Sequence, residues 1–447
     1  MTMSPPIETV DAIVVGASIR GLLAAHVLSE LGLRAVVLER GRGVGGADAS
    51  FALPSGAIFD HGLHVLDHQR SPIATELFTR VLDGAVHRST LRRGIVLRGE
   101  VMPYNPHPRE LPPDLRAMLP GDELTDDLGD ALPTRARLSH CYGAAFADLI
   151  FDEVLPSYPT ENRHRAFGVD EARLLTNLYP WFFPQARRAS GVGDGSRAFH
   201  DKLRRGEAQD VLYPREGGFG GFAAALVRSL AARVEVITHC SDLHVEIEAG
   251  SHRVAWVAAK GRRFTAPHCF WAAAWPALCK VLALPCQDVA TDRVLLGSFR
   301  LDRPAHTAYH ELLVGDPALH LNRVSFPARF RHSDEPLVQV EFAVPVAEAW
   351  PQTADDWLPR QVDDLRRLGV LDEEHRVEEQ DCRSFQMHFN AFGAEGKALV
   401  DADPGLLAPD SNVHPIAPSM ANLNLNTYVP QALAYVREVM AGAGASP

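Results

Sequence analysis

Paired cysteines, long apolar runs and repeated segments are all missing from this sequence. The cysteines are scattered and form no Cys-x-x-Cys pair: Cys141, Cys240, Cys269, Cys279, Cys286 and Cys382. Neither a zinc site built on paired cysteines nor a disulfide framework is therefore expected. No apolar run reaches the roughly 18 residues that a membrane-spanning helix needs, so no membrane insertion is expected. The sequence also contains no internal repeat and no low-complexity block.

Basic residues are fewer than acidic residues in this sequence. The 447 residues include 44 Lys and Arg against 56 Asp and Glu, which gives a formal net charge of −12 at pH 7, and no block of basic residues occurs. An acidic chain of this kind is a poor partner for nucleic acid or for anionic membranes. We therefore expect a small-molecule substrate as the partner, with local arginines meeting any anionic group, and we leave a homodimer open.

The remaining composition, 46% hydrophobic and 22% charged residues, is that of an ordinary globular protein of two or three lobes. The first expected strand starts about ten residues into the chain, which leaves no room for a secretory signal peptide. The simplest interpretation of the scattered cysteines is reduced thiols. Together these features predict a cytoplasmic protein.

The most informative segment covers residues 11–39 and reads DAIVVGASIRGLLAAHVLSELGLRAVVLE. An apolar strand over 11–15 is followed by a tight glycine turn over 16–21, which opens a helix over 22–31. A second buried strand covers 34–38 and ends at an acidic residue. Strand, glycine turn, helix, strand and acid in this order are typical of a βαβ unit that binds a dinucleotide.

The residues of this unit have separate expected roles. Gly16 allows the sharp turn, and Gly21 lets the helix pack against the strand. The N-terminus of the helix offers N–H groups and a partial positive charge to a pyrophosphate. Glu39 is placed to accept hydrogen bonds from an adenosine ribose.

Ser18 occupies the middle glycine position of the turn, where the backbone comes closest to the pyrophosphate. Serine adds a β carbon and a hydroxyl at this point. One interpretation is that the turn shifts slightly and the hydroxyl bonds a phosphate oxygen. The alternative is weakened or lost cofactor binding. We favour the first, because the rest of the unit is intact.

The stretch after the second strand indicates which dinucleotide is bound. It reads Glu39-Arg-Gly-Arg-Gly-Val-Gly-Gly46 and resembles the E-x-x-x-R-x-G-G extension of flavoproteins that bind FAD in an extended form. The resemblance implies that Gly45 and Gly46 bring backbone N–H groups to the pyrophosphate and the ribityl chain. Gly43 stands where an arginine is usual, with Arg42 one place early. NAD domains typically lack this extension, so FAD is the expected cofactor. The candidate cofactor residues of both segments are Gly16, Ser18, Gly21, Glu39, Arg40, Arg42, Gly45 and Gly46.

The character of the chain changes after the first 71 residues and later returns. Proline-rich loops and helical stretches come first, then a second glycine turn opens another amphipathic helix, and strand-like runs dominate after about residue 291. We predict an α/β fold, with a Rossmann-type FAD-binding domain and an inserted mixed helical and antiparallel-sheet substrate lobe. The expected segments are 1–71, 210–290 and 405–447 for the FAD-binding domain, 72–209 for the helical substrate lobe, and 291–404 for the sheet part of that lobe.

This order of segments resembles an FAD superfamily that includes UDP-galactopyranose mutase, protoporphyrinogen oxidase, amine oxidases and carotenoid desaturases. Three segments point to its mutase-like and protoporphyrinogen-oxidase-like branch. Residues 59–64 (Phe-Asp-His-Gly-Leu-His) resemble the mutase segment whose histidine lies near the flavin. Residues 213–218 (Tyr-Pro-Arg-Glu-Gly-Gly) resemble a turn before a helix of the FAD domain. Residues 311–327 resemble the stretch whose arginine, Arg323 here, reaches the active site, and Glu341 matches an acid that follows it.

The resemblance implies roles for a few side chains. His64 is a candidate catalytic residue over the flavin, with Gly62 beside it as a cofactor contact; a hydrogen-bonded core histidine is the alternative. Arg323 is the candidate catalytic residue that clamps the substrate, and a surface salt bridge is its alternative. No carboxylate or cysteine pattern accompanies the histidines at 61, 64 and 68, so no metal site is expected.

The C-terminal segment departs from the family pattern. In the mutases a G-R-x-G-x-Y segment places an arginine and a tyrosine at the substrate diphosphate and lays a helix N-terminus by the flavin. The corresponding stretch here, 417–428, has neither the Gly-Arg pair nor the tyrosine of that motif. Asn422 and Asn424 are candidate neutral donors to the flavin, or caps at a helix entry. The departure predicts a divergent member rather than an authentic UDP-galactopyranose mutase.

Three functions fit these patterns. The favoured one is an FAD-dependent oxidoreductase that acts on a small polar, sugar-like metabolite in a biosynthetic pathway. The second is a mutase-like, non-redox sugar isomerase that uses reduced FAD. The third is a degenerate, non-catalytic binding protein with the flavoprotein fold, and the substitutions at Ser18 and Gly43 motivate it.

Overall fold

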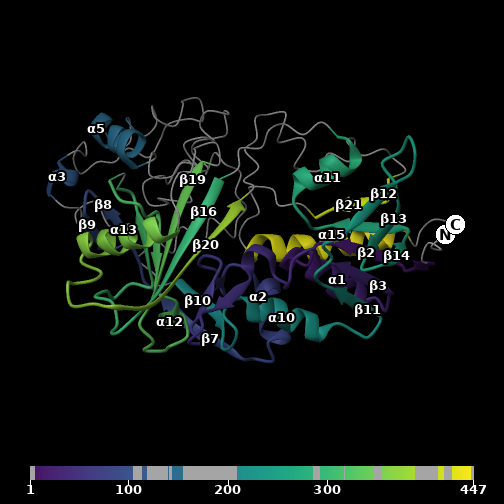
Figure 1. Ribbon diagram of the computed structural model, residues 1–447, viewed down its shortest axis with the longest axis horizontal. Helices are drawn as coiled ribbons and strands as arrows, with labels where there is room; N and C mark the ends of the chain where they lie inside the picture. Colours follow the sequence, from purple (N-terminus) through teal and green to yellow (C-terminus); the bar gives the residue numbers. More distant parts are fainter. Residues whose placement is uncertain are drawn as a thin grey trace.

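The computed structural model places a parallel α/β half and an antiparallel-sheet half side by side, with both chain termini at the parallel end (Figure 1). The residues that the structure describes are 6–103, 113–117, 139, 143–154, 209–284, 292–316, 318–345, 354–387, 411–416 and 425–443. Every structural statement below concerns these residues.

A five-stranded parallel sheet forms the centre of the first half. Its strand order is β11 (Val234–Ile237), β3 (Ala35–Leu38), β2 (Ala12–Val15), β15 (His268–Trp271) and β21 (Val413–Pro415). All of its neighbouring strands pair in parallel. Its strands thus come from three separated parts of the sequence, as a split Rossmann domain requires.

Alternate side chains of the central strands enter two different cores. Ala12 and Val14 pack with the helices α1 (Ile19–Glu30), α2 (Pro72–Val81), α10 (Gly220–Ser229) and α15 (Leu425–Ala443). Ile13 and Val15 pack on the other face, against a small sheet and α11 (Trp275–Leu282). Because both faces are covered, β2 and β3 are apolar at every position, as buried parallel strands usually are.

Smaller sheets surround the parallel sheet. The four-stranded sheet behind it has the order β1 (Ile7–Thr9), β14 (Arg262–Thr265), β13 (Val254–Ala259) and β12 (His244–Ile247). A three-stranded sheet has the order β6 (Leu66–Asp67), β10 (Gln209–Pro214) and β7 (Val86–Leu91). A hairpin joins β4 (Ser50–Ala52) to β5 (Ile58–Asp60).

A seven-stranded sheet forms the second half. Its order is β20 (Val377–Met387), β16 (Asp292–Leu301), β19 (Leu337–Pro345), β18 (Arg323–Ser325), β17 (Glu311–Val314), β8 (Arg93–Leu97) and β9 (Glu100–Pro103). All neighbours are antiparallel except β17 and β8. The amphipathic helix α13 (Ala354–Arg367) covers one face with Leu358 and Leu365. Short helical pieces complete the description: η1 (Gly46–Asp48), α3 (Pro113–Arg116), α5 (Ala144–Asp148), η3 (Leu149–Val154) and α12 (Pro327–Phe330).

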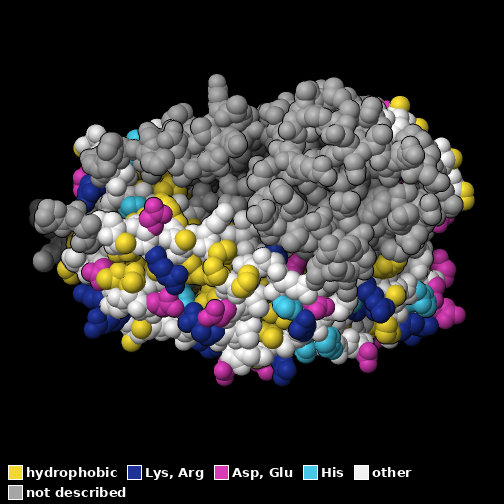
Figure 2. Space-filling model, turned by 180° about the vertical axis from the view of Figure 1, so that it is seen from behind, with side chains coloured by type: hydrophobic (Ala, Val, Ile, Leu, Met, Phe, Trp, Pro, Cys, Tyr) yellow, Lys and Arg dark blue, Asp and Glu magenta, His cyan; other side chains and the backbone are white. Residues whose placement is uncertain are grey.

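The predicted fold class is confirmed, because a Rossmann-type half and a largely antiparallel sheet lobe are both present. The exact five-segment division stays a prediction, and much of 72–209 falls outside the described residues. In the described part of the chain, no helix combines the length and the apolar character that crossing a membrane would need. Acidic and basic side chains are interspersed over the described surface that Figure 2 shows.

Candidate cofactor and substrate site

The first glycine turn joins β2 to α1 with no room for larger residues. Gly16 has φ +99°, a left-handed conformation that favours glycine, and a β carbon there would lie 2.9 Å from the Ala273 nitrogen. A β carbon on Gly21 would lie only 2.0 Å from the carbonyl oxygen of Gly16. Both glycines therefore have the roles predicted for them in the turn and in the packing of the helix.

Ser18 stands at the N-terminus of α1, just before its first helical residue. Its hydroxyl donates to the carbonyl of Ala272 at 3.2 Å, at the end of β15. The added side chain is thus accommodated by a bond to the neighbouring strand. In this conformation the single hydroxyl proton of Ser18 points to protein backbone.

Glu39 holds the turn from the tip of β3. Its Oε2 accepts the N–H of Ala17 at 2.8 Å, and its Oε1 accepts the N–H of Gly41 at 2.6 Å. A carboxylate can accept about four hydrogen bonds, so acceptor capacity remains for a ribose hydroxyl. Arg40 and Arg42 lie beside it and are exposed to solvent.

The second pair of glycines lies directly on the first turn. Gly45 and Gly46 have φ +104° and +64°, and the N–H of Gly45 donates to the carbonyl of Ala17 at 2.8 Å. A β carbon on Gly46 would lie 3.1 Å from the β carbon of Ser18. The two glycine segments predicted to hold one cofactor are therefore in contact with each other.

The loop that follows β5 brings His64 to the same place. Nδ1 of His64 lies 3.3 Å from Oδ1 of Asp48, and Nε2 lies 3.1 Å from the carbonyl oxygen of Ala47. Asp48 also accepts from the buried hydroxyl of Tyr428 at 3.5 Å, and the guanidinium of Arg20 lies 4.3 Å above the centre of that tyrosine ring. His64 thus lies beside the Gly45–Gly46 segment, and its place near a flavin stays a prediction.

The buried carboxylate of Asp60 connects the loop that carries His64 to the glycine turn before α10. It accepts from the hydroxyl of Ser50 at 2.5 Å, from the hydroxyl of Tyr213 at 2.6 Å and from the N–H of Phe219 at 2.8 Å. Burial raises the pKa of Asp60 above its ordinary value, while these hydrogen bonds oppose the rise. A β carbon on Gly218 would lie 2.6 Å from Asp60 Oδ1. The glycine therefore allows the turn to close over the acid.

Arg323 is part of a chain of ion pairs. Its Nε and Nη2 donate to the two carboxylate oxygens of Glu341 at 2.8 and 2.5 Å, and its Nη1 lies 3.6 Å from the buried carboxylate of Glu311. Arg93 pairs with Glu311 from the other side. Burial alone would raise the pKa of Glu311, but the two arginines outweigh it and hold the pKa below its ordinary value.

Glu341 links this ion network to the loop that carries His64. Its Oε1 accepts the N–H of Leu63 at 3.0 Å. Gly62 has φ +96°, and a β carbon there would lie 3.1 Å from that same oxygen. The side chain of Arg323 is 29% exposed. Glu341 therefore lies between Arg323 and the loop that carries Gly62 and His64.

Sequence reasoning missed several residues of this region. Asp60 stands inside the segment 59–64 but was given no role; its partner Ser50 lies across the same hairpin, and its partner Tyr213 is 153 positions away. The aspartate directly before the matched histidine pair was the available signal. Asn422 and Asn424 lie outside the described residues, and Asn426, at the start of α15, donates to the carbonyl of Asp67.

The comparisons with known proteins agree with this geometry. A family model described as an NAD(P)-binding Rossmann-like domain matches residues 14–81. Reduced UDP-galactopyranose mutase superposes on 97% of this chain and 96% of its own, with a TM-score of 0.70 and 14% identity. A putative protoporphyrinogen oxidase from Exiguobacterium sp. 255-15 superposes on 98% of this chain and 100% of its own, with a TM-score of 0.65 and 16% identity.

The chain has the fold of these proteins. Wild-type putrescine oxidase bound to putrescine also superposes, on 98% of this chain and 100% of its own, with a TM-score of 0.56 and 14% identity. A search of curated proteins gives no sequence match. The fold that the motifs predict is therefore confirmed, since the mutase, the putative protoporphyrinogen oxidase and the putrescine oxidase share it over almost their whole length.

Proposed function

We propose that the protein is an FAD-dependent oxidoreductase that acts on a small polar metabolite. The observation that carries this is the contact between the two glycine segments, with Ser18 against Gly46 and Glu39 bonded to the first turn. The expected cofactor contacts are Gly16, Ser18, Gly21, Glu39, Arg40, Arg42, Gly45, Gly46, Gly62, Asn422 and Asn424.

The described residues fit a dinucleotide. Gly16 and Gly46 adopt left-handed conformations in which a β carbon would meet neighbouring protein atoms, so glycine is needed to close the turn that would receive the pyrophosphate. The start of α1 supplies N–H groups and a positive dipole end for a pyrophosphate. The carboxylate of Glu39 is held at the strand tip, where it would accept a hydrogen bond from a ribose hydroxyl. When bound, FAD would supply the redox chemistry, because it can take up a hydride or electrons.

His64 is proposed to hold and move a proton beside the flavin. Both of its ring nitrogens face oxygen atoms: Nδ1 faces the Asp48 carboxylate, and Nε2 faces the Ala47 carbonyl. Asp48 therefore orients the ring, while the 23% exposure of His64 leaves it accessible to substrate.

Arg323 is proposed to hold an anionic or strongly polar group of the substrate. Glu341 and Glu311 fix the plane of the guanidinium, so its orientation is set before a substrate arrives. A guanidinium offers a planar fork that suits carboxylate or phosphate. Sugar-like metabolites of a biosynthetic pathway are the substrates we favour.

A mutase-like isomerisation is the second candidate, and the similarity to reduced UDP-galactopyranose mutase favours it. The C-terminal motif lacks its Gly-Arg pair and its tyrosine, which argues against an isomerase, because these residues are the ones expected to bind a substrate diphosphate. Anaerobic mixing of the FAD-loaded protein with sugar nucleotides, amines and alcohols separates the two. Loss of the oxidised flavin spectrum on mixing supports oxidation. Turnover only after dithionite reduction, with no net redox change, supports the isomerase.

A further inference from the structure

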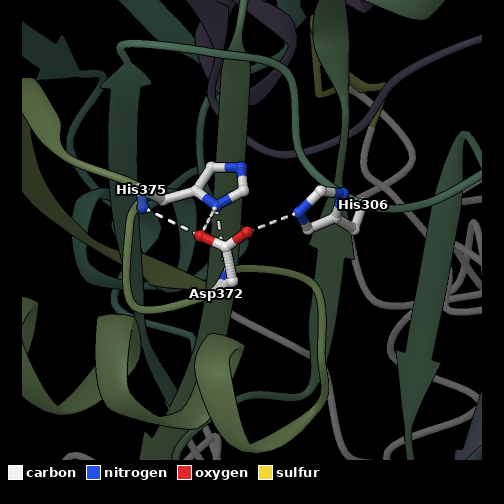
Figure 3. Close-up of side chains that lie close together, drawn as sticks. All are labelled: His306, Asp372 and His375. Carbon is white, nitrogen blue, oxygen red and sulfur yellow. Dashed lines mark hydrogen bonds and ion pairs between the residues drawn. The ribbon is translucent and has the colours of Figure 1, made fainter.

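Three side chains with metal-binding atoms meet at the edge of the seven-stranded sheet, in the loops that flank its β16–β20 pair. Figure 3 shows His306 and His375 pointing toward Asp372 from opposite sides. His306 follows β16, and the other two residues lie between α13 and β20. Nε2 of His306 lies 2.8 Å from Oδ2 of Asp372, and Nδ1 of His375 lies 2.7 Å from Oδ1.

The main chain holds these loops in place. The N–H of His306 donates to the carbonyl of Val370 at 2.9 Å. The carboxylate of Asp372 accepts the N–H groups of Glu374 and His375 at 2.9 and 3.0 Å. The bond from His306 to Val370 therefore ties the two loops together, and the bonds from Glu374 and His375 hold the Asp372 carboxylate within its own loop.

His375 is oriented in the way that metal-binding histidines usually are. Its side chain has no exposed surface, and its Nε2 lies 3.1 Å from the carbonyl oxygen of Pro304. A carbonyl only accepts, so Nε2 donates to it, and Nδ1 lies on the side of Asp372. A backbone carbonyl behind the ring is the common second partner of a metal-binding histidine, because it fixes the tautomer.

Nδ1 of His375 faces a carboxylate oxygen of Asp372 at 2.7 Å. The N–H of Asp372 also points to Nδ1, at 3.1 Å. The carboxylate and the ring nitrogen are therefore held next to each other, as two ligands of one metal ion must be.

The third proposed ligand, His306, has a side chain that can change its position. The side chain of His306 is 57% exposed and that of Asp372 is 44% exposed. The donor atoms of the three residues lie within 4.8 Å of one another. Bonds of about 2.0–2.2 Å in a tetrahedral zinc site would set neighbouring donors about 3.3 Å apart. A small rotation of His306 and a slight opening of the two contacts would reach that geometry, with water in the fourth position.

The local charge and the donor types select the kind of ion. Four acidic residues crowd these loops against two basic ones: Asp302, Asp372, Glu373 and Glu374, against Arg303 and Arg376. Two imidazoles and one carboxylate suit Zn²⁺ and similar transition metals, whereas Ca²⁺ and Mg²⁺ prefer oxygen ligands throughout.

We propose that His306, Asp372 and His375 bind one divalent transition-metal ion, with Zn²⁺ as the best fit. The ion would join the loop after β16 to the loop before β20 and so stabilise the edge of the seven-stranded sheet. The site is separate from the candidate cofactor site: Leu296 of β16 pairs with Glu341, and Leu301 at the end of the strand lies five residues further (301 − 296), roughly 16 Å away. No sequence motif indicates this site, because His306 precedes Asp372 by 66 positions.

The test is Zn²⁺ binding by the full chain after treatment with EDTA and desalting. Titration with ZnCl₂ alone, against a chromophoric chelator, gives stoichiometry and affinity, and thermal unfolding gives the accompanying stabilisation. His306→Ala is the main variant, because its exposed side chain can be removed without disturbing the core. His244→Ala is the matched control, since His244 is 59% exposed and pairs with Glu246 at 3.1 Å.

The proposal expects one tight Zn²⁺ per chain in the wild type, a rise in the unfolding midpoint with Zn²⁺, and binding at least about tenfold weaker in His306→Ala. Asp372→Asn should show the same loss, and His244→Ala should bind as the wild type does. Equal binding by the wild type and His306→Ala would overturn the proposal, because cysteines or other histidines would then hold the ion. The absence of stoichiometric binding would overturn it as well and leave a hydrogen-bonded cluster.

Discussion

Ser18 and Gly46 are in direct contact: a β carbon placed on Gly46 would lie 3.1 Å from the β carbon of Ser18. This contact joins the two glycine segments on which the proposed cofactor site depends. Ser18 fills space that a glycine would leave open, and the hydroxyl is retained by Ala272. Any residue larger than glycine at position 46 would therefore press on Ser18.

Replacing Gly46 with alanine should therefore weaken FAD binding. The left-handed conformation at φ +64° costs a non-glycine residue roughly 1–2 kcal/mol, and the new methyl group would press on Ser18. We expect an FAD dissociation constant about tenfold higher or more, measured by quenching of flavin fluorescence. Gly43→Ala is the matched control, because no described heavy atom lies within 4 Å of its β-carbon position. Equal losses in both variants would contradict this account of the contact.

Ser18→Gly should leave FAD affinity equal or tighter. The substitution restores the usual glycine and removes only a 3.2 Å hydrogen bond to Ala272. A bulky residue, as in Ser18→Leu, should weaken binding by more than about tenfold, because it has no space beside Gly46. Isothermal titration with FAD checks both. If Ser18→Gly abolished binding, the hydroxyl would be an essential phosphate ligand after all.

Arg323→Ala should raise KM or lower kcat while the FAD content stays normal. The guanidinium is proposed to meet the substrate, and removal also leaves Glu341 without its partner next to the His64 loop. Steady-state kinetics and the flavin absorbance per chain give the two readouts. Arg300→Ala, which removes a surface ion pair with Glu378 at 3.2 Å on the same sheet, is the control. Unchanged kinetics in Arg323→Ala would show that Arg323 only forms salt bridges within the protein and does not bind the substrate.

Glu311 should contribute stability that depends on pH. Its pKa is lower in the folded protein than in the unfolded chain, so its contribution is fully present above the unfolded value of about 4.3 and is lost as the pH falls through the folded value. Glu311→Gln should lower the free energy of unfolding at pH 7 by about 3–5 kcal/mol, because Arg93 and Arg323 lose a buried partner.

Chemical denaturation at several pH values checks this. The difference between the wild type and Glu311→Gln should shrink below pH 4.3 or so, as the wild-type acid becomes protonated. Glu335→Gln, in the exposed pair with Arg331, should cost less than about 1 kcal/mol. A difference that is independent of pH would show that Glu311 is not ionised in the folded protein.

The sequence predicted those parts of the fold whose residues lie close together along the chain. Gly16, Gly21 and Glu39 lie within one βαβ unit, where apolar spacing and glycine placement determine the local structure. The pairing of that turn with Gly45 was also accessible, because the segment follows the second strand directly.

The parts that sequence could not predict depend on contacts between distant residues. Asp60 and Tyr213 are 153 positions apart, and Arg93 and Glu311 are 218 apart. A buried acid that receives its partners from several strands has no periodic signature. Arg323 was matched by resemblance alone, and its bonds to Glu341 and Glu311 became visible only once β17, β18 and β19 were placed side by side.

The most direct test of the central claim is the absorption spectrum of the purified full-length chain, taken before and after incubation with FAD and desalting. The account predicts the two-banded spectrum of an oxidised flavin, with one FAD per chain that is released when the protein is denatured, since no Cys or His lies in a recognisable attachment motif. A colourless protein that retains no FAD after incubation would contradict it.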